Sequence, residues 1–78
     1  MSESMTLTLS VNGEQRVLEP TPDPACLSTV IPALGQNPAL VVVELNGVIV
    51  PKGRWPTERV REGDTLEIVT IVGGGSYS

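Results

Sequence analysis

Hydrophobic and polar residues alternate at the start of the chain. Every second residue from Leu7 to Val11 is apolar, with threonine and serine between. This period of two is typical of a strand with one buried face. The pair Asn12-Gly13 follows, and it favours the type I′ turn of a two-residue hairpin because both residues tolerate positive φ. We therefore expect a hairpin whose second strand covers residues 14–18.

The next part of the chain predicts one short helix. Asp23 is a suitable N-cap, and Pro24 is a suitable first helical residue. Four apolar residues then recur at helical spacing and predict one buried stripe: Leu27, Val30, Ile31 and Leu34. Pro32 removes the hydrogen bond to the Ser28 carbonyl, at a cost of about 3 kcal/mol in a regular helix. We therefore expect a short, kinked or broken helix that ends near Gly35.

The second half of the chain predicts three further strands. Residues 40–45 are a nearly continuous run of strand-forming residues, which favours a well-buried strand. Asn46-Gly47 predicts a second tight turn before a short strand over residues 48–50. Trp55 is the only large apolar residue of the polar loop that follows, so we expect it to anchor that loop in the core. Residues 65–72 are apolar on both faces, which indicates a central strand.

The order of these elements predicts an α+β fold, in which a mixed sheet of four to five strands carries one helix across one face. With 78 residues, the chain is expected to form one compact domain. We place that domain at residues 6–72. Residues 1–5 are expected to be a flexible N-terminus, and residues 73–78 a flexible C-terminal tail.

Composition argues against several classes of function. The formal charge of −4 disfavours a nucleic-acid partner, and the absence of histidine removes the commonest general base and metal ligand. Cys26 is the single cysteine, which excludes an internal disulfide, and we interpret it as a buried structural residue. No apolar stretch approaches the roughly 20 residues that span a bilayer. We expect a cytoplasmic protein that is not an enzyme, does not bind membranes and holds no metal.

The run Gly73-Gly74-Gly75 has two interpretations. On composition alone, it is a flexible end or a linker. The functional interpretation is a tail that enters the active site of another protein. Glycine has no Cβ, so such a tail fits a channel that is too narrow for side chains.

Four segments of the second half, taken in order, resemble the ThiS family, the ubiquitin-like sulfur carriers of thiamin biosynthesis. These segments are Val43–Pro51, Trp55, Glu62–Val69 and Val72–Gly75. The family pattern is a Val-x-Leu/Val-Asn-Gly-x-Ile-Val-Pro segment, a later Trp, a Gly-Asp turn and a terminal Gly-Gly. The similarity is strongest over residues 40–75. It implies a β-grasp (ubiquitin-like) fold, which agrees with the order of elements predicted above.

The resemblance also implies a mechanism in which the chain is a co-substrate of other enzymes. In the family, an E1-like adenylyltransferase uses ATP to activate the carboxylate of the C-terminal glycine. Sulfur from a donor such as a cysteine desulfurase converts that group to a thiocarboxylate, and thiazole synthase uses the sulfur to build the thiazole ring. By position, the reactive glycine is Gly75, at the end of the segment Gly73-Gly74-Gly75. ATP is consumed by the partner, so we expect no bound cofactor.

Three residues, Ser76, Tyr77 and Ser78, depart from the family pattern because they follow Gly75. While they remain, the Gly75 carbonyl is part of an amide, and there is no carboxylate to adenylate. The leading hypothesis is that a C-terminal protease, such as a JAMM-type metalloprotease, cleaves between Gly75 and Ser76. Two alternatives stay open: the three residues are not native, or the protein has lost the thiocarboxylate role.

Two other functions also stay open at this point. One is a β-grasp sulfur carrier of another pathway, which supplies molybdopterin, cysteine or secondary-metabolite synthesis. The other is a passive β-grasp interaction module, in which the glycines are an inert linker. For docking on partners we expect exposed apolar residues beside the tail, with Val69, Ile71 and Val72 as candidates. Leu66 and Ile68 take that role if the helix covers the opposite face.

Overall fold

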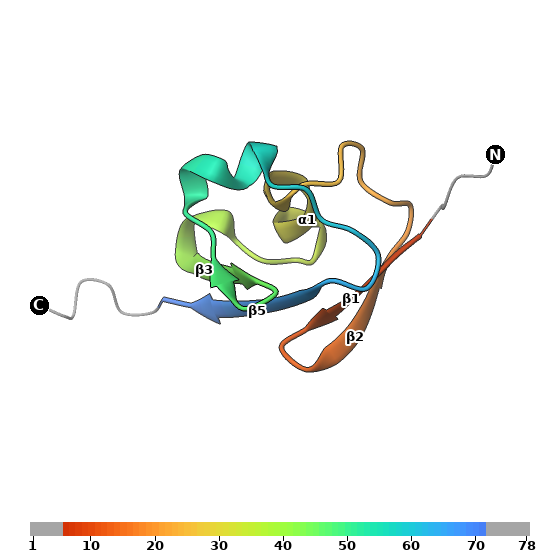
Figure 1. Cartoon of the computed structure of the whole chain (residues 1–78), viewed down its shortest axis with the longest axis horizontal. Helices are drawn as coiled ribbons and strands as arrows, with labels where there is room; N and C mark the ends of the chain where they lie inside the picture. The colour runs from red at the N-terminus through yellow and green to blue at the C-terminus, as the bar shows by residue number, and fades with distance from the viewer. Residues whose placement is uncertain (1–5, 72–78) are drawn as a thin grey trace, which may run out of the picture.

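The computed structural model describes residues 6–71, whose strands form one mixed sheet (Figure 1). In chain order the elements are β1 (Leu7–Val11), β2 (Glu14–Leu18), α1 (Leu27–Ala33), the 3-10 helix η1 (Pro38–Leu40), β3 (Val41–Leu45), β4 (Val48–Ile49), the 3-10 helix η2 (Lys52–Thr57) and β5 (Thr65–Thr70). The five strands are ordered β2-β1-β5-β3-β4. Strand β1 is parallel to β5, and the other neighbouring pairs are antiparallel. The predicted α+β class, with one helix on a mixed sheet, is confirmed.

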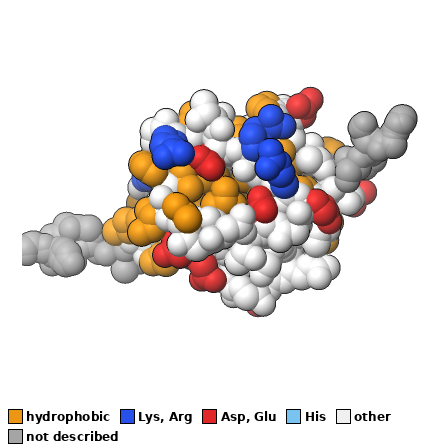
Figure 2. All heavy atoms as spheres, viewed as in Figure 1, with side chains coloured by type: hydrophobic (Ala, Val, Ile, Leu, Met, Phe, Trp, Pro, Cys, Tyr) orange, Lys and Arg blue, Asp and Glu red, His pale blue; other side chains and the backbone are white. Residues whose placement is uncertain are grey.

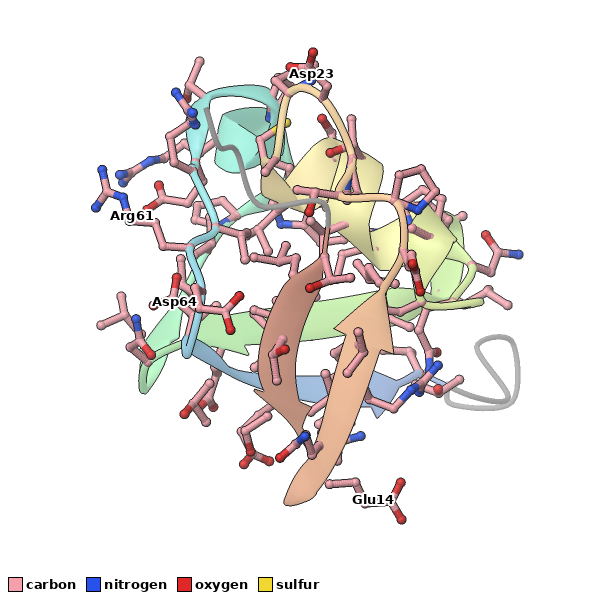
Figure 3. The ribbon with its side chains drawn as sticks, turned by 90° about the vertical axis from the view of Figure 1, so that its right-hand side faces the viewer. Glu14, Asp23, Arg61 and Asp64 are labelled. Carbon is pink, nitrogen blue, oxygen red and sulfur yellow. The ribbon has the colours of Figure 1, made fainter. Side chains whose placement is uncertain are left out.

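The core lies between the sheet and α1, as the side view in Figure 3 shows. Within residues 6–71, no polar or charged residue is buried. The predicted helical stripe supplies Leu27, Val30 and Ile31, which are fully buried. Trp55 is only 4% exposed, and its indole N–H donates a hydrogen bond to the Val50 carbonyl at 2.9 Å. The predicted anchoring of this loop by Trp55 is therefore confirmed.

Helix α1 begins later than its predicted N-cap, Asp23. The N-cap is Cys26, whose N–H donates to the Thr29 hydroxyl at 3.2 Å, so Pro24 lies outside the helix. The reason is tertiary pairing, because the segment before the helix bonds to residues 58–60. The Val60 N–H donates to the Ala25 carbonyl at 2.9 Å, and the Leu27 N–H donates to the Glu58 carbonyl at 3.0 Å. These contacts override the local capping signal of the Asp-Pro pair.

The other end of α1 matches the prediction of a short helix. Pro32 lies in the last turn, and the helix ends at Ala33. Gly35 has a φ of +84°, the left-handed conformation typical of the residue after a helix C-cap.

The two central strands each bury only one face, which corrects the prediction of β3 as a well-buried strand. In β3 the odd-numbered residues face the core, whereas Val42 is 38% exposed. In β5, Leu66 and Ile68 are buried, whereas Val69 and Ile71 are exposed. The central position of β5 is confirmed, but it comes from the strands on either side and not from cover on both faces. The face of the sheet opposite α1 therefore displays apolar residues to solvent, and we call it the open face.

Candidate functional site

The residues predicted to carry the chemistry lie outside the described residues. They are Gly73, Gly74 and Gly75, together with Val72 and the predicted cleavage site between Gly75 and Ser76. The structure describes the surface from which this segment continues. Ile71 is the last described residue and directly follows β5, the middle strand of the sheet. The candidate site is therefore the end of β5 and its surroundings.

A patch of apolar side chains lies on the open face around the end of β5. The register of β3 and β5 places Val42 opposite Val69, and the Ile71 N–H bonds to the carbonyl of Leu40 at 2.6 Å. Period-two alternation brings the side chains of Val42, Val69 and Ile71, and that of Ile49 on β4, to one face. Leu40 ends η1 and lies next to them because its carbonyl accepts from Ile71. We call the following residues the open-face patch: Leu40, Val42, Ile49, Val69 and Ile71.

The exposure of this patch separates the two sets of docking candidates. Val69 is 61% exposed and Ile71 is 51% exposed, whereas Leu66 and Ile68 belong to the core. Figure 2 shows hydrophobic side chains gathered beside the C-terminal end of the described chain. Large exposed apolar side chains that cluster in this way are typical of interaction sites. The structure thus leaves Val69 and Ile71 accessible to a partner, next to the start of the glycine segment.

Two carboxylates border the open-face patch. Glu44 and Glu67 are opposite each other on β3 and β5, one step further from the end of β5 than Val42 and Val69. Within residues 6–71 the one ion pair joins Arg54 to Glu58, so neither border carboxylate is neutralised by an ion pair there. A partner surface that is apolar at its centre and basic at this edge would complement the patch.

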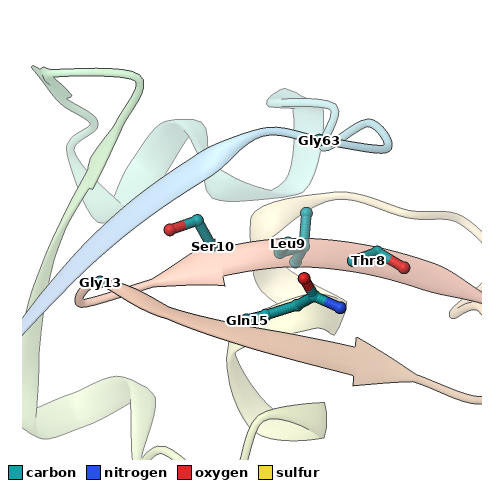
Figure 4. Close-up of a pocket in the computed structure, with 6 residues that line it drawn as sticks. All are labelled: Thr8, Leu9, Ser10, Gly13, Gln15 and Gly63. Carbon is teal, nitrogen blue, oxygen red and sulfur yellow. The ribbon is translucent and has the colours of Figure 1, made fainter.

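The other half of the open face, over β1 and β2, carries mainly polar side chains. A shallow hollow of about 330 Å³ lies over β1 and β2 (Figure 4). Its polar side chains are those of Thr8, Ser10 and Gln15, and Gly63 closes it from the loop before β5. Leu9 also lines the hollow, but it is only 1% exposed and belongs to the core. The exposed apolar side chains therefore cluster at the β3–β5 end of the face, and among the described residues Val17 is a single exposed apolar residue at the other end.

Two asparagine side chains hold β5 in place, and the first is Asn12. Strand β1 pairs with β5 only at Ser10 and Val11. Beyond that point, the Asn12 side chain replaces a strand partner: its Oδ1 accepts from the Ile68 N–H at 2.7 Å, and its Nδ2 donates to the Ile68 carbonyl at 3.1 Å. Asn12 thus extends the β1–β5 ladder toward the end of β5.

The side chain of Asn46 also bonds to the main chain of β5, on the β3 side and at the first residue of the strand. Its Oδ1 accepts from the Thr65 N–H at 2.9 Å, and its Nδ2 donates to the Asp64 carboxylate at 3.2 Å. Asp64 in turn accepts the Arg61 backbone N–H at 2.8 Å, in the loop labelled in Figure 3. Sequence reasoning assigned both asparagines to turns alone. Their positive φ values of 52° confirm the turns, but a local pattern carries no signal for these long-range bonds.

The described residues offer little chemistry of their own. Cys26 is buried, and the Ser28 hydroxyl at 3.1 Å from its Sγ lowers the pKa of the thiol against the opposing effect of burial. Among residues 6–71 there is no group of three or more Cys, Asp or Glu residues placed to hold a metal ion. In the same part of the chain, no helix is long and apolar enough to cross a membrane.

Comparison with known proteins decides which family has this architecture. The model of the ThiS family matches residues 9–75. The chain belongs to the ThiS family. A solved ThiS structure, the thiamine biosynthesis protein of Geobacter metallireducens, is similar to it with a TM-score of 0.68 and 29% sequence identity. The similarity covers 88% of this chain and all of that one, so the resemblance to the family and the predicted β-grasp fold are both confirmed.

Relatives of this ThiS-family chain include both longer and similar-sized proteins. A thiazole synthase of Paramagnetospirillum magneticum is 37% identical over 70 residues, which are 90% of this chain but 21% of that protein. The chain therefore spans about a fifth of that relative's length. The uncharacterized protein ycf40 of Pyropia yezoensis is 32% identical over 69 residues, and the match covers 88% of this chain and 93% of that protein.

Proposed function

We propose that the protein is a sulfur carrier of thiamin biosynthesis whose reactive atom is the C-terminal carbonyl carbon of Gly75. An E1-like adenylyltransferase joins the Gly75 carboxylate to AMP, and pyrophosphate leaves ATP. A desulfurase holds the sulfur of cysteine as a persulfide, whose terminal sulfur displaces AMP to form an acyl disulfide with the desulfurase. A thiol reductant then cleaves this disulfide, which frees the desulfurase cysteine and leaves a thiocarboxylate on Gly75. Thiazole synthase takes the sulfur from this group. The carrier itself supplies the acyl group and no catalytic side chain.

The observation that carries this proposal is the extent of the family match. The match runs to Gly75 and leaves Ser76, Tyr77 and Ser78 outside, which supports Gly75 as the position where the family's chemistry takes place. The same boundary supports the removal of the three following residues by a protease before adenylation. Glycine at this position leaves the carbonyl open to a nucleophile because there is no Cβ beside it.

The open-face patch is the surface on which the activating enzyme and thiazole synthase dock. Val69 and Ile71 are its residues closest in sequence to the glycines, and Val72, outside the described residues, is the third predicted contact. Full burial of one such side chain contributes about 1.5–3 kcal/mol, so a few of them suffice for a transient complex. Glu44 and Glu67 at its border favour partners with lysine or arginine there.

Intact-mass analysis tests the proposal. The full-length chain and a chain that ends at Gly75 are each incubated with the adenylyltransferase, a cysteine desulfurase, cysteine, a thiol reductant and ATP. We expect the mass change of one oxygen-to-sulfur exchange in the shorter chain alone. Sulfur loading of the uncleaved full-length chain would contradict the processing step. Loading of neither chain would contradict the carrier function itself.

A further inference from the structure

Strand β5 runs past its neighbour β1 and leaves part of its edge unpaired. The β1–β5 pairing ends at Val11, where the chain turns into the β1–β2 hairpin. Figure 1 shows β5 continuing beyond that turn toward the C-terminal end. This unpaired edge lies beside the segment that leads to Gly75. Whatever binds the edge therefore affects the direction in which that segment leaves the sheet.

The pairing with β3 sets the direction of each peptide group in β5. At one end of this ladder the Asn46 N–H donates to the Thr65 carbonyl at 2.8 Å, and at the other the Ile71 N–H donates to Leu40. In an antiparallel pair, hydrogen-bonded and non-bonded residues alternate. The odd-numbered residues of β5 therefore bond to β3, and the even-numbered residues direct their N–H and C=O groups to the β1 side.

Asn12 hydrogen-bonds to the main chain of Leu66 and Ile68, whereas the main-chain N–H and C=O of Thr70 have no such partner among residues 6–71. The Leu66 carbonyl accepts from the Asn12 backbone N–H at 2.9 Å, and both peptide groups of Ile68 bond to the Asn12 side chain. Thr70 is the next residue with that orientation and is exposed. Among residues 6–71, no strand or side chain reaches its N–H and C=O on this side.

We propose that the Thr70 edge accepts a β-strand of thiazole synthase, which extends the sheet beside β5 and fixes the direction of the tail. This inference rests on the proposed function and deepens it. Thr70 offers one donor and one acceptor, the set that a hydrogen-bonded antiparallel pair exchanges. The extended chain from Thr70 to Gly75 spans at most about 18 Å, so a strand bound at Thr70 also limits where the reactive carbonyl can lie.

Thiazole synthase is the partner because a segment similar to this chain occurs within a protein of that name. The segment similar to this chain makes up 21% of the Paramagnetospirillum magneticum thiazole synthase, and the rest of that protein accompanies it in the same chain. The patch residues Val69 and Ile71 flank Thr70 and lie on the open face, where side chains of an added strand would contact them. Main-chain bonds and adjacent apolar contacts are the usual combination in strand addition.

Amide hydrogen exchange of the full-length chain tests the inference directly. In the free protein, we expect the Thr70 N–H to exchange quickly and that of Ile71 slowly, because Ile71 is bonded to Leu40. Saturation with the thiazole synthase of the same genome is expected to slow the exchange of Thr70 at least tenfold. An unchanged Thr70 rate in the saturated complex would overturn the proposal. Slow exchange of the Thr70 N–H with the activating enzyme but not with thiazole synthase would also overturn it. So would slow exchange that depends on the concentration of this chain alone, because a second copy would then occupy the edge.

Proline substitutions provide a second, independent test. Thr70→Pro removes the N–H from this edge and spares the bonds to β3, and we expect its dissociation constant for thiazole synthase to rise about fivefold or more. The matched control is Val17→Pro, because β2 is the edge strand and the register across the Asn12-Gly13 turn directs the Val17 N–H to solvent. Wild-type affinity in a folded Thr70→Pro variant would refute the role of this edge.

The two proposals fail in different ways. If the wild-type chain ending at Gly75 acquires no sulfur, the carrier function is wrong whatever Thr70 does. If it acquires sulfur and delivers it while Thr70 stays unprotected, the carrier function holds and the strand addition is wrong. If Thr70→Pro does not fold, the exchange measurement on the wild-type chain decides.

Discussion

Replacement of Asn12 tests how β5 is held in the sheet. Asn12→Gly removes both side-chain bonds to Ile68 and keeps a residue that tolerates the φ of 52°. Each bond contributes about 1 kcal/mol, so we expect the free energy of unfolding to fall by about 2 kcal/mol. For a chain of 78 residues the whole free energy of unfolding is about 4–12 kcal/mol, so this loss is a large fraction of it.

Urea titration is the appropriate assay for this variant. Trp55 is the single tryptophan and is buried, so its fluorescence reports unfolding of the core. Asn12→Asp is the intermediate control, because it keeps the acceptor for the Ile68 N–H and loses the donor to the Ile68 carbonyl. We expect the free energy of unfolding of this variant to lie between those of the wild type and Asn12→Gly. A glycine variant within about 0.5 kcal/mol of wild type would show that these bonds do not hold β5.

Three further predictions concern the core, the open face and the cysteine. Trp55→Phe loses the bond to the Val50 carbonyl, and we expect a loss of about 1–2 kcal/mol in urea titrations followed by circular dichroism. Val69→Ser is expected to weaken binding to the adenylyltransferase at least fivefold by calorimetry, whereas Thr8→Ala, in the polar half of the open face, keeps wild-type affinity; equal effects would contradict docking on the patch. Cys26 is expected to resist a thiol reagent in the native protein and to react fully in urea; rapid native labelling would contradict its burial.

Local patterns predicted most of the elements correctly. The two Asn-Gly turns, the strands that flank them and the helical stripe each depend on residues close in sequence. The burial of Trp55 was also predicted correctly, because a single large apolar side chain in a polar loop is most stable when it packs in the core. The family resemblance, confirmed by the match to residues 9–75, supplied the fold name that the patterns alone did not.

The features that sequence reasoning missed are all long-range. The helix start was wrong because pairing of Ala25 with Val60 outweighs the local Asp-Pro signal. The bonds from Asn12 to Ile68 connect residues 56 positions apart, and no periodicity records them. The exposed face of β3 was predicted as buried because an apolar run looks the same whether its second face meets a helix or a partner protein. The docking surface and the edge at Thr70 therefore emerge only from the assembled sheet.

The position of β5 has a consequence for how the protein is made. This strand is synthesised last among the described elements, yet it separates β1 from β3 in the sheet. Its contacts, such as Ser10 with Thr65, span most of the chain, so folding has a high contact order and cannot finish during translation before β5 emerges. A truncated chain without β5 would have two hairpins that share no strand neighbour. An incomplete carrier therefore presents neither the open-face patch nor the Thr70 edge, and partners meet only chains whose last strand is in place.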